Sequence, residues 1–276
     1  MRVLIVGLGL MGGAYAYKLK NKGYKVYATD INRESIEYAI YKGYIDDGSS
    51  KPETLIKKSD IIILALYPNL ILDFLKKYSK YFNENQIITD ISGVKTSFVY
   101  EAEKLALPAA YVSHHPMAGR EKSGVSNSKD VSFDGANFLI TVTPNSKQYV
   151  VEILKTLGVD LGFERINVID IEKHDNMIGF TSQLTHAIAV SLVNSDHEKD
   201  TKYFIGDSYR DLTRIAKINE VLWSELFLEN KENLLNHIES FEHELDKLKT
   251  ALKENDRDKL KELFINSTSI RKEMDK

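Results

Sequence analysis

The chain has 276 residues, 43% of them hydrophobic and 28% charged, which is enough for a folded core and excludes an intrinsically disordered chain. A formal net charge of −3 gives no general attraction to nucleic acid or anionic membranes, and we expect neither as a partner. The absence of cysteine excludes disulfides, thiolate metal sites and a cysteine nucleophile, and it is compatible with the cytoplasmic location that we expect.

Short apolar runs alternate with helical patterns through the first half of the chain. The predicted strands are residues 2–6, 25–29, 61–66, 87–91, 110–113 and 138–142. Such alternation is typical of a mostly parallel sheet with helices on both faces. We therefore predict an α/β fold that begins with a doubly wound parallel sheet.

The second part of the chain has a different periodicity. Strand-like residues end at about Val168, and from Ile171 onward the apolar spacing is helical. The predicted domains are therefore residues 1–168, which hold the sheet, and 169–276, which are all helical. No run reaches the ~20 apolar residues that span a bilayer.

One apolar stripe lies on a long predicted helix near the end of the chain. Its members are Leu234, Ile238, Phe241, Leu245, Leu248 and Leu252. Their spacing of three and four residues places them on one face. This face packs either on its own domain or on a second subunit, and we predict a homodimer formed through the C-terminal helices.

A glycine-rich turn follows the first predicted strand. It has the GxGxxG pattern, formed by Gly7, Gly9 and Gly12 with Leu10 and Met11 between them. In a dinucleotide-binding turn the glycines permit a tight bend, close approach of the pyrophosphate and close helix packing. The helix N-terminus then offers N–H donors to phosphate. We predict a Rossmann-type domain whose cofactor site includes these five residues; helix packing without a nucleotide is the alternative.

The second predicted strand ends at Asp30, at the usual distance of about 20 residues from the glycine pattern. Its carboxylate would accept hydrogen bonds from ribose hydroxyls and repel a 2′-phosphate, which favours NAD over NADP. Arg33 lies close enough in sequence to bind a 2′-phosphate, so NADP stays open as the alternative.

Further motifs follow in a fixed order. They are DISGVK at 90–95, HPMAG at 115–119, EKSG at 121–124 and DLTRIA at 211–216. With matches from Gly7 to Asn230, this combination resembles the prephenate/arogenate dehydrogenase family. The resemblance implies NAD-dependent oxidative decarboxylation of prephenate to 4-hydroxyphenylpyruvate in tyrosine biosynthesis. Arogenate, which has an amine in place of the pyruvyl keto group, is the alternative substrate.

The resemblance also implies roles for single residues. His115 would accept a hydrogen bond from the ring hydroxyl of the substrate, and Arg214 would bind a substrate carboxylate; these are the predicted catalytic residues. His186 and Trp223 are predicted substrate contacts. The alternative for His186 is a histidine satisfied within the core, and for Trp223 a core anchor.

Other positions depart from the family pattern. Gln183 stands where the family often has a second histidine. Gly93 stands where a serine is common, so the preceding Ser92 is our candidate substrate contact. Lys95 is a candidate cofactor contact, with a solvated surface charge as the alternative.

Two charged residues complete the predicted substrate site. Arg120 would add a second cation, and Glu121 would pair with Arg214 unless it is a surface acid. The chemistry needs no metal, and we predict none.

A β-hydroxyacid dehydrogenase is the rival enzyme class, but it would offer a lysine on the interdomain helix, and residues 174–191 contain none. A nucleotide-sensing regulator is a further alternative, against which His115 and Arg214 argue.

Overall fold

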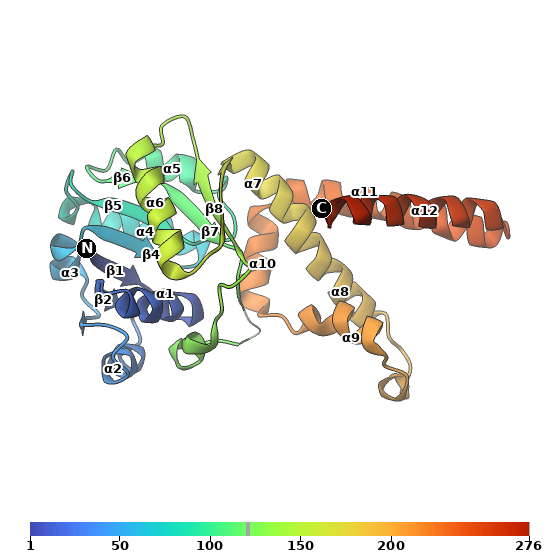
Figure 1. The fold of residues 1–276 in the computed structure, drawn as a ribbon, viewed down its shortest axis with the longest axis horizontal. Coiled ribbons are helices and arrows are strands. Elements are labelled where there is room, and N and C mark those ends of the chain that lie inside the picture. The colour runs from blue at the N-terminus through green and yellow to red at the C-terminus, as the bar shows by residue number, and fades with distance from the viewer. Residues whose placement is uncertain (120–121, 276) are drawn as a thin grey trace. The chain divides into compact units, whose positions relative to one another are not determined.

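A computed structural model describes residues 1–119 and 122–275 of the chain. These residues form two compact units, Met1–Asn230 and Lys231–Lys276. Figure 1 shows both units along the chain. The predicted site residues Arg120 and Glu121 lie outside the described residues. The domain boundary predicted after residue 168, from the change in apolar spacing, stays a prediction.

The first unit contains a six-stranded parallel sheet in the order β3-β2-β1-β4-β5-β6. Its strands are β1 (Arg2–Val6), β2 (Lys25–Thr29), β3 (Asp47–Gly48), β4 (Ile61–Leu64), β5 (Ile87–Asp90) and β6 (Ala110–Tyr111). The central strands are buried runs of Ile, Val and Leu, as expected where helices cover both faces. The chain reverses its direction across the sheet between β1 and β4, the point where such sheets bind ligands.

Helices cover this sheet on both faces (Figure 1). They are α1 (Leu10–Asn21), α2 (Arg33–Tyr41), α3 (Glu53–Lys58), α4 (Pro68–Tyr78), α5 (Val99–Lys104) and α6 (Gln148–Leu161). Neighbouring residues of β1 point to opposite faces, so Val3 and Ile5 join one apolar core while Leu4 and Val6 join the other. Short 3-10 segments at Ser79–Tyr81 and Val125–Asp130 complete the domain.

A second, three-stranded sheet lies beside the first. It contains β7 (Ser113–Pro116), β8 (Asn137–Val142) and β9 (Arg165–Asp170), with β7 antiparallel and β9 parallel to β8. The prediction that residues 138–142 extend the parallel sheet is therefore wrong. His115 lies within β7, opposite Leu139, although the strand predicted here ended at residue 113. The α/β fold class with a following helical part is confirmed.

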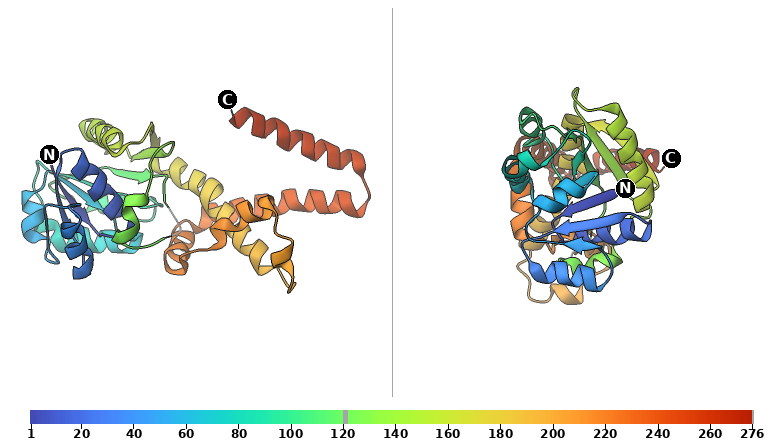
Figure 2. Two further views of the ribbon diagram at one scale, coloured as in Figure 1. Left: turned by 60° about the horizontal axis from the view of Figure 1, so that its bottom comes forward. Right: turned by 90° about the vertical axis from the view of Figure 1, so that its left-hand side faces the viewer.

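The rest of the first unit is helical. Helix α7 (Ile171–Ile178) continues through a π-helical turn, Gly179–Leu184, into α8 (Thr185–Asn194). A short 3-10 segment at Thr201–Tyr203, helix α9 (Asp207–Thr213), the 3-10 turn Arg214–Ala216 and helix α10 (Glu220–Glu229) follow. Figure 2 shows α7 and α8 as one long rod. A π turn inside a helix is frequent at functional sites.

The second unit is a hairpin of two helices, α11 (Lys231–Lys253) and α12 (Arg257–Met274). Asn255 adopts a left-handed φ of 55° between them, and Asp256 caps α12 by accepting the N–H of Lys259 at 2.9 Å. The single long helix predicted for the apolar stripe is confirmed, and Leu245 and Leu252 of that stripe are 51% and 64% exposed. Among the described residues, no helix combines the length and apolarity needed to cross a membrane.

Candidate active site

The glycine turn between β1 and α1 depends on two glycines for its own geometry. Gly7 has φ +96°, and a Cβ atom there would lie 2.4 Å from the carbonyl oxygen of Ala65. A Cβ atom on Gly12 would lie 1.9 Å from the carbonyl oxygen of Gly7. The chain therefore needs glycine at both positions to fold, whether or not it binds a ligand.

Gly9 is different, because nothing in the protein requires a glycine there. Its φ is −74°, which any residue adopts, and a Cβ atom would meet nothing within 4 Å. The missing side chain instead leaves the backbone open beside Leu10 and Met11, the first residues of α1, where N–H groups of a helix point outward. These residues fit the phosphates of a dinucleotide.

Asp30 follows the last residue of β2 and is held by two backbone donors. Its Oδ2 atom accepts the N–H of Leu8 at 2.5 Å, and its Oδ1 atom accepts the N–H of Asn32 at 2.7 Å. These bonds orient the carboxylate beside the glycine turn. Because a carboxylate has about four acceptor positions, Asp30 can still accept ribose hydroxyls.

Strand β7 is fixed by a buried histidine next to the predicted base. His114 has its Nε2 atom 3.0 Å from the hydroxyl of Tyr15 on α1, and its Nδ1 atom 2.7 Å from the hydroxyl of Thr89 on β5. Burial lowers the pKa of His114 to about 3, with a smaller contribution from Lys95. The neutral side chain of His114 therefore connects β7 to helix α1. Its neighbour His115 points to the other face of the strand.

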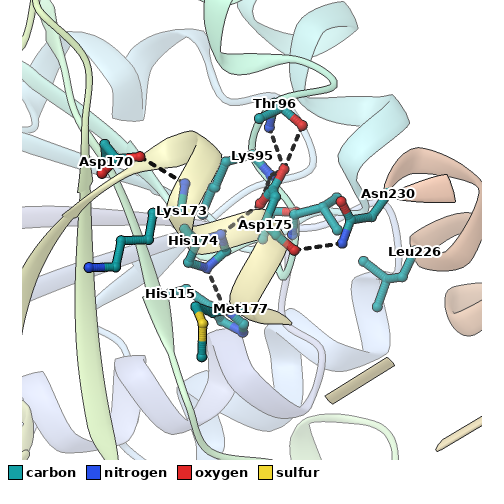
Figure 3. Close-up of polar contacts among 12 residues, drawn as sticks. Lys95, Thr96, His115, Asp170, Lys173, His174, Asp175, Met177, Leu226 and Asn230 are labelled. Carbon is teal, nitrogen blue, oxygen red and sulfur yellow. Dashed lines mark hydrogen bonds and ion pairs between the residues drawn. The ribbon is translucent and has the colours of Figure 1, made fainter. Parts of the chain in front are cut away.

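His115 meets a second histidine on helix α7 (Figure 3). Its Nδ1 atom lies 2.9 Å from Nε2 of His174, and Nδ1 of His174 lies 2.7 Å from Oδ1 of Asp175. Burial is the main cause that lowers the pKa of His115 well below its usual value, and the neighbouring His174 and Lys95 add to it. His115 is therefore neutral at neutral pH.

Asp175 connects helix α7 to the loop that follows β5. Its carboxylate accepts the N–H groups of Lys95 at 3.0 Å and Thr96 at 2.7 Å, together with the Thr96 hydroxyl at 2.6 Å. The carbonyl of Asp175 accepts the amide of Asn230 at 2.8 Å. Burial alone would raise the pKa of Asp175, but the hydrogen bonds from His174 and Thr96 outweigh it and lower that pKa.

Lys95 corrects a prediction. Its side chain is fully buried, and its ammonium donates to Asp90 and to the carbonyl of His114, both at 2.8 Å. The surface-charge alternative is wrong, and this ammonium has no accessible surface to offer to a cofactor. Burial lowers the pKa of Lys95, whereas ion pairing with Asp90 opposes that change. Through its hydrogen bonds to Asp90 and to the His114 carbonyl, Lys95 instead fixes the loop after β5 to strand β7.

Ser92 is buried, and its hydroxyl accepts the N–H of Val94 at 3.4 Å within its own loop. A contact between Ser92 and a substrate stays a prediction. The neighbouring Gly93 is the loop residue beside the predicted base, because a Cβ atom on it would lie 3.8 Å from Nε2 of His115.

His186 and Trp223 lie together, as their shared predicted role requires. Their rings stack with centroids 3.6 Å apart, and both side chains are partly exposed. Nδ1 of His186 faces the carbonyl of Ser182 at 2.8 Å. Trp223 is therefore not a fully buried core anchor, and a substrate contact stays a prediction for both residues.

Gln183 explains one departure from the family pattern. Its side chain is buried, donates to the carbonyl of Leu226 at 2.8 Å and accepts the amide of Asn230 at 2.7 Å. It therefore joins the π turn to helix α10. Leu226 in turn approaches Gly93, with its Cδ2 atom 3.5 Å from the position of a Cβ there.

Arg214 is exposed in the 3-10 turn after α9, which packs on helix α8. This places it on the same helical layer as His186, and its carboxylate-binding role stays a prediction. No role was predicted for His174, whose ring contacts His115, or for Asp175, whose carboxylate contacts His174. The signal was the adjacent His-Asp pair at the start of a helix.

Two family models match this chain. The model for the prephenate dehydrogenase nucleotide-binding domain matches residues 15–165, and the model for the prephenate dehydrogenase dimerization domain matches residues 170–266. These matches and the relatives described next argue against the two alternative classes, a β-hydroxyacid dehydrogenase and a nucleotide-sensing regulator.

Three relatives are similar over almost the whole chain. Prephenate dehydrogenase of Bacillus subtilis is 30% identical, covering 98% of this chain and 75% of the relative. That of Lactococcus lactis is 29% identical, covering 99% and 77%. The A. aeolicus prephenate dehydrogenase, solved with hydroxyphenyl propionate and NAD+, has 32% identity and a TM-score of 0.87, covering 100% of this chain and 98% of that one. With matches over both halves of its length, this chain belongs to the prephenate dehydrogenase family, a family of oxidoreductases.

Proposed function

We propose that this chain oxidises prephenate with NAD and releases carbon dioxide, which yields 4-hydroxyphenylpyruvate for tyrosine biosynthesis. The observation that carries the proposal is the neutral imidazole of His115, whose Nε2 side lies beside Gly93 in the loop after β5. The glycine turn follows β1, two strands away in the same parallel sheet. Since strands lie about 4.8 Å apart, the two loops occupy one edge of the sheet, about 10 Å from each other.

The cofactor would be held by the glycine turn and Asp30. Gly9 gives the open approach for phosphate, and the carboxylate of Asp30 accepts ribose hydroxyls and disfavours a 2′-phosphate. When bound, NAD supplies the acceptor for the hydride that leaves the carbinol carbon. The NAD+ in the A. aeolicus relative supports this choice.

His115 would act on the ring hydroxyl of prephenate. Its Nε2 atom accepts a hydrogen bond, and then the proton, as the carbinol becomes a carbonyl. Loss of the ring carboxylate as carbon dioxide then makes the ring aromatic, and the hydroxyl oxygen becomes the phenol oxygen of the product. The same proton can return from His115 to that oxygen. Base assistance of this kind is typically worth about 10²- to 10⁴-fold.

The helical part would hold the rest of the substrate. Arg214 suits capture of a carboxylate, because its guanidinium is permanently charged and fork-shaped. His186 and Trp223 would contact the substrate from the neighbouring helix faces. Hydroxyphenyl propionate, bound in the A. aeolicus relative, has the same combination of a ring hydroxyl and a side-chain carboxylate.

We also propose that the chain works as a homodimer through its C-terminal helices. The match to a dimerization domain over residues 170–266 supports this, as do exposed apolar residues on both helices of the second unit. Phe264 and Ile265 of α12 are 58% and 69% exposed, in addition to Leu245 and Leu252 of α11. The location in the cytoplasm stays a prediction.

The proposed function is tested by mixing the purified chain with each pair of cofactor and substrate. The pairs combine NAD or NADP with prephenate or arogenate, and the absorbance of the reduced nicotinamide is followed. We expect the highest kcat/KM with NAD and prephenate. A higher kcat/KM with arogenate would assign the alternative substrate, and no reduction in any pair would refute a dehydrogenase acting on these compounds.

A further inference from the structure

Asp175 can only accept hydrogen bonds in its surroundings. Its side chain is fully buried, and it faces the N–H groups of Lys95 and Thr96 and the hydroxyl of Thr96. A carboxylate that receives so many donors is held in its ionised form. The ring nitrogen of His174 that faces Asp175, Nδ1, must therefore carry a proton.

The protonation of His174 follows from this contact. Burial lowers the pKa of His174 more than its hydrogen bond to Asp175 raises it, so the ring is neutral. A neutral imidazole with its proton on Nδ1 has a lone pair on Nε2. That lone pair faces Nδ1 of His115 at 2.9 Å, and it can only accept a proton donated from there.

We infer that Asp175 and His174 are positioning residues that fix His115 in the tautomer with its proton on Nδ1 and a lone pair on Nε2. This inference rests on the proposed function, in which Nε2 of His115 accepts the hydroxyl proton of the substrate. The opposite tautomer would present an N–H to that hydroxyl and could not accept its proton. This chain of contacts, which we call the relay, also places the buried negative charge of Asp175 behind the imidazolium of His115 that forms, with only the ring of His174 between them.

The same carboxylate fixes the position of the base. Asp175 binds the backbone of Lys95 and Thr96, so helix α7 is attached to the loop after β5 (Figure 3). A Cβ atom on Gly93 of that loop would lie 3.8 Å from Nε2 of His115. His174 on the same helix contacts His115 on β7. Asp175 therefore sets both the protonated nitrogen and the place of His115 from outside the reacting atoms.

The test reads the tautomer of His115 directly by two-bond ¹H–¹⁵N correlation spectra of the full chain with ¹⁵N-labelled histidine, without cofactor or substrate. The signal of His115 is assigned by its loss in H115N. In the parent chain we expect a protonated Nδ1 and an unprotonated Nε2. In D175N the side-chain amide donates a hydrogen bond to Nδ1 of His174. The ring protons of His174 and of His115 should then both move from Nδ1 to Nε2. The inference is overturned if the parent carries its proton on Nε2, or if D175N keeps the parent tautomer.

Activity adds a second readout. D175N should lose about 10²- to 10⁴-fold in kcat, as isosteric loss of a tautomer-setting carboxylate does in serine proteases, while the Kd for NAD stays within about twofold. D160N, an Asp→Asn change on α6 whose carboxylate accepts only the Tyr24 hydroxyl among the described contacts, is the matched control and should keep the parent kcat. H174Q retains an acceptor for His115 and should keep far more activity than H174F; equal losses would contradict the relay. Because the spectra need no substrate, they stay decisive even if prephenate is not oxidised.

Discussion

Nδ1 of His115 on strand β7 lies 2.9 Å from Nε2 of His174 on helix α7, across 59 residues of sequence. This contact joins the second sheet to the helical part of the chain. It leaves Nε2 as the one ring nitrogen of His115 that can meet a substrate. The chemistry proposed for the chain depends on that nitrogen being unprotonated.

The acid limb of kcat/KM should lie below pH 6.5, the ordinary histidine pKa being ~6.5. Burial lowers the pKa of His115, so the neutral, active form persists as pH falls and activity is lost only as pH passes below the lowered value. H115N should remove this limb and reduce kcat by about 10²- to 10⁴-fold. H243N, at an exposed position of α11, is the control. An acid limb that is unchanged in H115N would exclude His115 as the base.

Arg214→Gln should raise KM for prephenate more than it lowers kcat. A charged hydrogen bond to a carboxylate contributes about 1.5–3 kcal/mol, so KM should rise about 10- to 100-fold. Because this contact would bind the substrate equally in the ground state and the transition state, its loss raises KM and leaves kcat nearly unchanged. R210Q, which removes an exposed guanidinium paired with Asp207 on α9, should leave KM unchanged. A loss confined to kcat would instead indicate that Arg214 acts in the transition state.

Gly9→Ala should weaken NAD binding without lowering stability, whereas Gly12→Ala should lower stability. A methyl group on Gly9 meets no protein atom within 4 Å, so the Tm should stay near that of the parent, while the Kd for NAD rises by at least about tenfold through loss of close phosphate approach. A methyl group on Gly12 would lie 1.9 Å from the carbonyl oxygen of Gly7, so the Tm should fall. Unchanged NAD affinity in G9A would show that the turn does not hold the cofactor.

Asp30→Asn should move cofactor preference toward NADP. Removing the negative charge ends the repulsion of a 2′-phosphate and weakens the contact to ribose hydroxyls, and we expect the NAD-to-NADP ratio of kcat/KM to fall about tenfold. D47N, on the edge strand β3, is a control for the loss of one charge. A ratio that changes equally in both variants would remove Asp30 from cofactor selection.

Replacing Leu245 and Leu252 together with Asp should separate the proposed dimer. Both side chains are exposed members of the apolar stripe on α11, where charges would oppose burial against a second copy. Sedimentation velocity should show the parent as a dimer and the double variant as a monomer. V159D, which changes an exposed valine of α6 to an acid, should remain dimeric. A monomeric parent would contradict the dimer itself.

Local constraints made much of the fold predictable. The glycine pattern, the spacing to Asp30 and the apolar strands are encoded by residues close in sequence, and the structure places five of the six predicted strands in the first sheet. The second sheet was harder to predict. Strand β7 carries the polar sequence SHHP, and β9 is largely exposed, so neither shows the apolar run of a buried strand.

The site was only partly predictable, because its contacts join residues far apart in sequence. His115 was found through its motif, but His174 and Asp175 gained a role only from the folded contacts. Lys95 resembles a surface charge in the sequence, and only its buried pairing with Asp90 and His114 shows otherwise.

The most direct test of the central claim is the stoichiometry of one reaction. Prephenate, deuterated at its carbinol carbon, is incubated with NAD and the purified chain, and the reduced cofactor, carbon dioxide and 4-hydroxyphenylpyruvate are measured together by mass spectrometry. We predict one of each per prephenate consumed, with the deuterium on the nicotinamide and almost no turnover in H115N. Prephenate that is left intact, or reduced cofactor that forms without carbon dioxide, would contradict the account.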